Sequence, residues 1–149
     1  MPYSTRTFAS DLSQLAAMRE FLDQTCRRVW VVEADDDVLC QLELATHEAA
    51  TNIIRHAYEG RPGLPIQMAV EVDADTARVT LAHTGREFDP GVVAPPRFDG
   101  SRFGGFGVYL IGQLVDEVTS ARDDEGRFVI RLVKRRRPAG DTVERSGRE

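Results

Sequence analysis

The apolar residues of this chain change their spacing along the sequence, and that change limits the folds open to it. Over residues 11–29 and 35–58 they recur every three or four positions, which predicts two amphipathic helices. Over residues 65–73 and 76–83 apolar and polar residues alternate, which predicts two strands joined in a hairpin at Ala74-Asp75. Helices and strands that are apolar on one side must bury those sides against each other. The pattern therefore favours an α+β sandwich.

The remaining segments extend this pattern in both directions. Residues 4–9 predict a first strand, and residues 118–122 and 127–134 predict a final hairpin. A helix-like run to Val118 precedes that hairpin, and a loop from Thr84 to Gly105 separates it from the strands before. The order β-α-α-β-β-loop-α-β-β predicts helices on one face of a mixed, mostly antiparallel sheet. A loop of about twenty residues in such a domain is usually functional.

The chain of 149 residues is long enough for one ordinary domain. We assign residues 1–137 to that domain, because the apolar periodicity ends there. Residues 138–149 are polar and show no period, so we expect a disordered tail.

Charge and hydropathy exclude several classes of protein. The net charge of −5 argues against direct binding to nucleic acid, whose phosphates need a positive surface. We interpret the one basic run, Lys134–Arg137, as a solvated strand end rather than a phosphate or membrane patch. No stretch approaches the roughly 20 apolar residues of a membrane span, and the polar N-terminus does not resemble a secretory signal. We therefore expect a cytoplasmic protein that binds no membrane.

The two cysteines, Cys26 and Cys40, form no metal-binding pattern with each other or with histidine. Each falls in a helix-like, partly apolar stretch, so we expect two buried free thiols. A disulfide between them remains an alternative.

Three polar residues of different chemistry share the second predicted helix. On a continuous α-helix, Glu48 and Asn52 differ by about 40° and Arg55 lies within about 20° of Glu48. A carboxylate could act as a general base, an amide oxygen could bind Mg²⁺ and a guanidinium could pair with phosphate. An ordinary exposed helix face with contacts among these residues is the alternative.

Two glycine-containing stretches could contact a ligand. Gly104-Gly105-Phe106-Gly107 opens the predicted third helix, where backbone N–H groups could bind an anion. Residues 83–90, His-Thr-Gly-Arg-Glu-Phe-Asp-Pro, directly follow a strand. A plain turn is the alternative at 83–90, because Asp-Pro is itself a turn signal.

These three stretches, in this order, resemble the anti-sigma-factor serine-protein kinases of the GHKL (Bergerat-fold, histidine-kinase-like) ATPase superfamily. Residues 48–58, Glu-Ala-Ala-Thr-Asn-Ile-Ile-Arg-His-Ala-Tyr, look like the family's N-box. Residues 83–90 resemble its G1 box, and Gly105-Phe106-Gly107 resembles its G2 box. The resemblance spans about residues 5–134 and implies the Bergerat fold, a two-layer α+β sandwich.

The resemblance also implies site residues. Glu48 would be the catalytic general base, Asn52 would hold Mg²⁺ between the phosphates of ATP, and Arg55 would lie near those phosphates. Further nucleotide-binding positions would be His83, Gly85, Phe88, Gly104, Gly105 and Gly107. Among these, Gly85 would allow close approach of the adenine, and Gly105 and Gly107 would shape the phosphate-binding turn.

The function implied is that of an anti-sigma regulatory factor that uses ATP to phosphorylate a serine on an anti-anti-sigma (STAS-type) partner. Such proteins control the availability of a sigma factor and usually form homodimers. This chain departs from the family at His83, where the family has an aspartate that accepts a hydrogen bond from the adenine amino group. The alternative is therefore a pseudokinase binding module with weak or no ATP use. The catalytic domain of a sensor histidine kinase or gyrase-like ATPase is a third reading.

Overall fold

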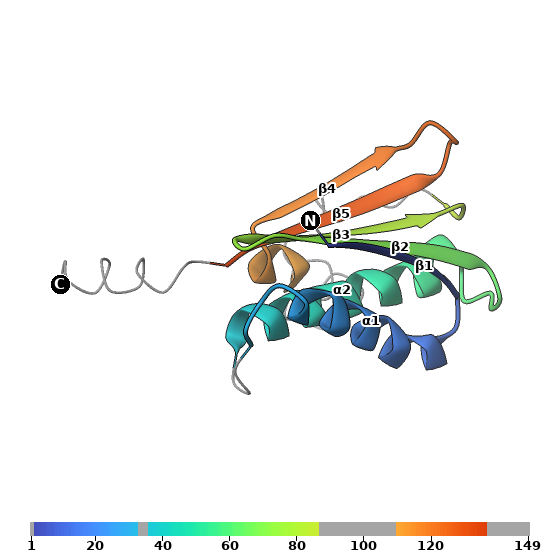
Figure 1. Cartoon of the computed structure of the whole chain (residues 1–149). Helices are drawn as coiled ribbons and strands as arrows, with labels where there is room; N and C mark the ends of the chain where they lie inside the picture. Colours follow the sequence, from blue (N-terminus) through green and yellow to red (C-terminus); the bar gives the residue numbers. More distant parts are fainter. Residues whose placement is uncertain (1, 33–35, 87–109, 137–149) are drawn as a thin grey trace, which may run out of the picture.

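A five-stranded sheet carries its helices on one face, as the apolar pattern predicts (Figure 1). This architecture comes from a computed structural model, in which residues 2–32, 36–86 and 110–136 are described. In chain order its elements are β1 (Tyr3–Ala9), the 3-10 turn η1 (Leu12–Gln14), α1 (Leu15–Arg27), α2 (Asp37–Asn52), the π-helical turn η2 (Ile53–Ala57), β2 (Pro65–Val72), β3 (Thr76–His83), β4 (Glu117–Arg122) and β5 (Phe128–Arg135).

The strands lie in the order β1-β2-β3-β5-β4, and each neighbouring pair is antiparallel. Every strand predicted from alternation is confirmed to within one residue at each end. In the register of the central hairpin, Val70 pairs with Val79 and Met68 with Leu81. These paired residues are all buried on the same face, which fixes the register because a slip of one residue would expose them.

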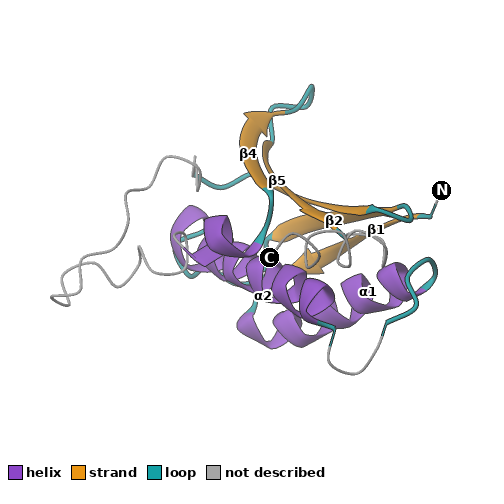
Figure 2. Cartoon of the chain, turned by 90° about the vertical axis from the view of Figure 1, so that its left-hand side faces the viewer, coloured by secondary structure: helices purple, strands orange, loops and turns teal. Residues whose placement is uncertain are grey.

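The core fills the space between the sheet and the helices, so the two-layer sandwich is confirmed. Figure 2 shows both long helices on the same side of the sheet. The buried residues that meet in this layer include Met18, Leu22, Leu42, Ala45, Ile53, Ile66, Met68, Leu81, Ile130 and Leu132. The opposite face of the sheet bears polar side chains, among them Gln67, Glu71, Arg78, Thr80 and Arg131.

The first helix is shorter than the predicted span of residues 11–29. Asp11 caps a 3-10 turn by accepting a hydrogen bond from the Ser13 N–H, and the α-helix begins at Leu15. Leu12, predicted to belong to the apolar face, is 46% exposed because it lies in that turn. Farther along the helix, Met18 and Cys26 are buried as expected.

The prediction for the two cysteines is correct for one and wrong for the other. Both are free thiols, so the disulfide alternative does not hold. Cys26 is buried between the helices and the sheet, and burial raises the pKa of its thiol to about 12. Cys40 is exposed, because it lies on the side of α2 turned away from the buried residues Leu39 and Leu42.

The third predicted helix ends earlier than Val118. A short helical segment occupies residues 110–114, with Ile111 buried, and β4 already begins at Glu117. Val118 therefore belongs to the sheet, where it pairs with Leu132. Most of the predicted loop from Thr84 to Gly105 lies outside the described residues.

The basic run at the end of β5 is not simply solvated. The Lys134 ammonium donates to the Gln41 side chain and to the Leu114 carbonyl, both at 2.7 Å. Arg136 lies over the ring of Trp30, 5.1 Å from its centroid, and donates to the Val31 carbonyl. These side chains fasten the end of β5 to the helical layer.

Candidate functional site

The described residues place the candidate site where the end of the second helix meets the end of β3. Glu48 and Asn52 lie on α2, Arg55 lies in η2, and His83 is the last residue of β3 with Gly85 two residues beyond it. Four predicted site residues lie outside the described part of the chain: Phe88, Gly104, Gly105 and Gly107.

The predicted continuous helix over residues 35–58 changes its geometry at Asn52. From Ile53 the backbone makes a π-turn, in which the Tyr58 N–H donates to the Ile53 carbonyl at 2.8 Å, five residues back. The angular position derived for Arg55 from a continuous α-helix is therefore wrong, and Arg55 is exposed. Such π-turns are rare and occur frequently at functional sites.

Asn52 is the last residue before this π-turn and is only 5% exposed. Its Nδ2 is buried and makes no hydrogen bond to any described residue. A buried polar atom without a partner usually signals a missing water, ion or ligand. Since an amide can exchange its oxygen and nitrogen by a flip, Asn52 can offer either an acceptor or a donor to such a ligand.

Glu48 lies four residues before Asn52 on the regular part of α2, so the two side chains share one side of the helix. Glu48 is half-buried, whereas its neighbours Ala49 and Ala50 are fully buried. A carboxylate at this boundary keeps access to solvent and can exchange protons with a bound group.

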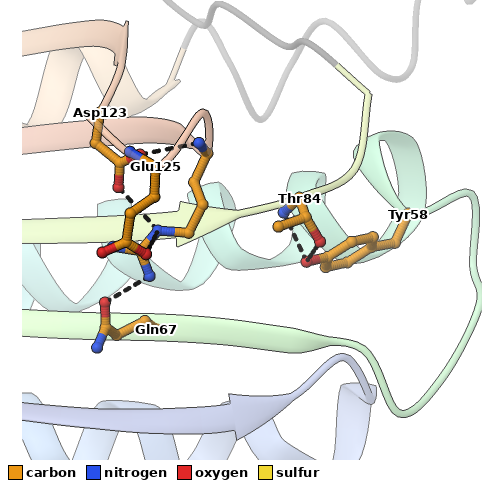
Figure 3. Close-up of polar contacts among 6 residues, drawn as sticks. Tyr58, Gln67, Thr84, Asp123 and Glu125 are labelled. Carbon is orange, nitrogen blue, oxygen red and sulfur yellow. Dashed lines mark hydrogen bonds and ion pairs between the residues drawn. The ribbon is translucent and has the colours of Figure 1, made fainter.

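The end of β3 is fastened to the end of the helix through Tyr58, which is itself 1% exposed. Its hydroxyl accepts a hydrogen bond from the Thr84 N–H at 2.9 Å and donates one to the Pro65 carbonyl at 2.5 Å. Figure 3 shows the Tyr58 hydroxyl directed at Thr84, where the chain leaves the sheet. The Arg86 N–H donates to the Ala57 carbonyl at 2.8 Å, which adds a second connection.

Gly85 lies between these two connections, and its lack of a side chain is essential to them. A Cβ on Gly85 would lie 2.5 Å from the Ala57 carbonyl oxygen and 2.8 Å from Cδ1 of Tyr58. Real Cβ atoms do not approach that closely, so only glycine fits this backbone. Gly85 therefore has a role in joining β3 to the helix. This role is additional to the close approach of the adenine that the family resemblance implies.

His83 is 1% exposed and packs against two aromatic rings. The ring centroids of Tyr58 and Phe128 each lie 5.8 Å from that of the imidazole. Burial lowers the pKa of His83, so the imidazole is neutral at pH 7. Its Nδ1 accepts a hydrogen bond from the Gly85 N–H at 3.1 Å, while its Nε2 is buried and has no partner among the described residues.

Sequence reasoning did not find the roles of Tyr58 and Thr84 in assembling the site. Tyr58 ends the N-box-like stretch of residues 48–58, but its hydrogen bond to Thr84 joins residues 26 positions apart. A tyrosine at the end of an amphipathic helix, with glycine just after a later strand, is a weak signal for such a contact. The π-turn has no residue signature that periodicity could detect.

The described residues contain no group of three or more His, Cys, Asp and Glu side chains that could hold a metal. Among the described residues of the site, Asn52 carries an amide oxygen and Glu48 a carboxylate that could contact a metal. In the same residues, no helix has both the length and the apolar character needed to cross a membrane.

Comparison with known proteins agrees with the geometry. Residues 8–134 match the family model described as a histidine kinase-like ATPase domain. The chain is 30% identical over 101 residues to serine-protein kinase RsbW of Staphylococcus epidermidis, which covers 62% of each protein. It is 35% identical over 88 residues to serine-protein kinase RsbW of Bacillus pumilus, covering 52% of this chain and 54% of that protein. The matches thus span between half and two thirds of these relatives.

Proposed function

Because the chain belongs to the histidine kinase-like ATPase domain family, we propose that it is an anti-sigma regulatory factor with serine-protein kinase activity. Its substrate would be a serine on an anti-anti-sigma partner of the STAS type, and its phosphoryl donor a nucleoside triphosphate, ATP by the family's name. The relatives named serine-protein kinase RsbW support the reaction type. The observation that carries the proposal is the buried Nδ2 of Asn52, which has no hydrogen-bond partner among the described residues and lies one helical turn after Glu48.

The described residues fit a magnesium nucleotide at this site. Asn52 can turn its amide oxygen toward a cation, and Mg²⁺ takes oxygen ligands while keeping waters and phosphates in its other positions. His83, in the sheet layer of the sandwich, offers a second buried polar atom without a partner among the described residues. A bound magnesium nucleotide would supply the transferable phosphoryl group, and its Mg²⁺ would neutralise part of the negative charge on the phosphates. Phe88, Gly104, Gly105 and Gly107 remain our proposed further contacts.

In this proposal Glu48 acts as the general base. A half-buried carboxylate close to Asn52 can accept the proton of a serine hydroxyl as that oxygen attacks phosphorus. Arg55 is exposed in η2 and would pair with phosphate oxygens at the entrance to the site. Phosphoryl transfer needs positioning and charge neutralisation more than covalent participation by the protein, which suits this small set of groups.

The partners follow from the same proposal. The unphosphorylated STAS partner and the sigma factor would compete for this chain, and phosphorylation would release the STAS partner. We also propose that the chain acts as a homodimer, which sedimentation of the purified protein would test.

A second candidate function is a pseudokinase module that binds its partners without using nucleotide. One observation favours it. Nε2 of His83 is buried without a described partner, and the neutral ring offers no negative charge to attract the amino group of adenine. The kinase reading is preferred because a module of this kind has no need for a buried amide nitrogen that lacks a described partner and lies beside a carboxylate.

A phosphotransfer assay separates the two functions. Candidate STAS proteins are incubated with the full chain, Mg²⁺ and either ATP or GTP labelled at the γ-phosphate. The kinase proposal predicts label on a serine of one STAS protein, lost when that serine is changed to alanine. Stable complexes with a STAS protein but no labelling by either nucleotide would establish the pseudokinase module instead.

A further inference from the structure

Tyr58 connects two parts of the molecule that lie far apart in the sequence. Its backbone N–H donates to the Ile53 carbonyl at 2.8 Å, which closes the π-turn that begins directly after Asn52. Its side-chain hydroxyl accepts a hydrogen bond from the Thr84 N–H at 2.9 Å, where the chain leaves β3. The turn that follows Asn52 and the exit from β3 are therefore both fastened to Tyr58.

The hydroxyl of Tyr58 uses its hydrogen-bonding groups within the protein. It donates its proton to the Pro65 carbonyl and accepts from the Thr84 N–H. The Thr84 hydroxyl lies 3.3 Å away and can donate to the remaining lone pair, as Figure 3 shows. These partners occupy the proton and both lone pairs of a side chain that is 1% exposed. Any influence of the hydroxyl on a ligand must therefore act through the backbone that it holds.

The backbone on the two sides of this junction is closely packed. The Arg86 N–H donates to the Ala57 carbonyl at 2.8 Å, and a Cβ on Gly85 would lie 2.5 Å from that carbonyl oxygen. The chain beyond β3 thus lies directly against the last residues of the π-turn. Without the Tyr58 hydroxyl, fewer hydrogen bonds hold these two segments together, so a larger fraction of the molecules would have them apart.

We infer that Tyr58 is a positioning residue for the proposed nucleotide site: its hydroxyl holds the exit of β3 against the turn after Asn52 and thereby raises the affinity for a magnesium nucleotide that it does not touch. The inference rests on the proposed function and deepens it. A ligand binds less tightly when only a fraction of the molecules has the binding-competent arrangement, because that fraction multiplies the affinity. Loss of the paired Tyr58 hydrogen bonds corresponds to about a tenfold change in such an equilibrium.

Ser10 offers a matched control for this hydroxyl. Its side chain also donates to a carbonyl, that of Arg61 at 2.7 Å, and accepts from a backbone N–H, that of Leu64 at 2.9 Å. Ser10 is 1% exposed, as is Tyr58. Ser10→Ala and Tyr58→Phe therefore each remove a buried hydroxyl that bridges two backbone groups, but the described partners of Ser10 include neither the π-turn nor the exit of β3.

The test is calorimetric titration of the full chain with Mg·ADP, at a temperature at which circular dichroism shows wild type and both variants to be folded. Tyr58→Phe should bind about tenfold more weakly than the wild type, and Ser10→Ala should stay within about a factor of three. A purely structural role predicts equal affinities for the two folded variants, and that result would overturn the inference while leaving the nucleotide site intact. Absence of Mg·ADP binding by the wild type would overturn the proposed site and the inference together.

A second measurement uses the wild type alone and does not depend on whether Tyr58→Phe folds. Amide hydrogen exchange is followed at Thr84, which donates to Tyr58, and at Leu64, which donates to Ser10. Saturating Mg·ADP should slow exchange at Thr84 by a larger factor than at Leu64, because binding selects the molecules in which the junction is closed. Equal slowing of both amides, or no change at Thr84, would contradict the inference.

Discussion

The hydroxyl of Tyr58 accepts a hydrogen bond from the backbone N–H of Thr84 at 2.9 Å, and this contact joins the helical layer to the end of β3. The same hydroxyl donates to the Pro65 carbonyl at the start of β2. The contact thus joins the two layers of the sandwich next to His83, whose Nε2 is buried without a described partner.

Tyr58→Phe should lower the free energy of unfolding by about 1–3 kcal/mol, because it leaves the Thr84 N–H and the Pro65 carbonyl without their partner. Urea unfolding followed by circular dichroism measures the change. The matched control is Tyr3→Phe, because Tyr3 is 61% exposed and its hydroxyl is not needed by the core. Equal stability of the two variants would mean that the Tyr58 contact contributes nothing.

Gly85→Ala should also destabilise the protein, by roughly 1–3 kcal/mol, because the new Cβ would meet the Ala57 carbonyl at 2.5 Å. Gly112→Ala is the control, since a Cβ there meets nothing within 4 Å. It should stabilise the short helical segment by up to about 1 kcal/mol. The midpoint of thermal unfolding should therefore shift in opposite directions in the two variants. An unchanged midpoint in Gly85→Ala would refute the close approach.

Glu43 should make stability depend on pH. Burial, together with a hydrogen bond to the adjacent Asp23 carboxyl and charge repulsion from it, raises the pKa of the Glu43 carboxyl to about 7. Because the folded pKa lies above the unfolded value of 4.5, its stabilising contribution is complete below pH 4.5 and is lost as the pH rises through 7.

Glu43→Gln removes this titration, so the variant should gain stability relative to the wild type between pH 5 and pH 8. Urea midpoints measured across that range test the prediction. Glu20→Gln, an exposed change on α1, controls for the loss of one negative charge. A constant difference between Glu43→Gln and wild type at all pH values would show that the Asp23–Glu43 pair does not hold a proton.

Glu48→Gln should abolish serine phosphorylation while leaving nucleotide affinity within about a factor of three, because the amide keeps the shape of the side chain but cannot accept the proton. Single-turnover phosphotransfer and calorimetry on the same preparation separate the two effects. Undiminished turnover would remove Glu48 as the general base.

Much of the fold could be predicted because burial on one face imposes a period on each element. The alternation in 65–73 and 76–83 located β2 and β3 to within one residue, and three- and four-residue spacing located both helices. The π-turn after Asn52 could not be predicted, because a shift in backbone hydrogen bonding leaves no mark in the spacing of apolar residues. The helical wheel therefore misplaced Arg55.

The sequence suggests which residues form the candidate site, but it does not show how they are arranged. Glu48, Asn52, His83 and Gly85 were identified from motifs, yet the reason that Gly85 cannot carry a side chain lies in Ala57, which is distant in sequence. Likewise, the Gly85 N–H donates to Nδ1 of His83, a contact that only the folded backbone reveals.

The central claim is that Asn52 and His83 belong to one magnesium-dependent nucleotide site, and calorimetric titration with purine nucleoside diphosphates tests it most directly. With Mg²⁺ present, the wild type should show saturable binding of at least one of GDP, IDP and ADP, and chelation of the metal should weaken it. Asn52→Ala should lose the magnesium dependence, whereas Thr51→Ala, one residue earlier on α2, should retain it. Magnesium-dependent binding that survives in Asn52→Ala, or no binding of any of these nucleotides at millimolar concentration, would contradict the account.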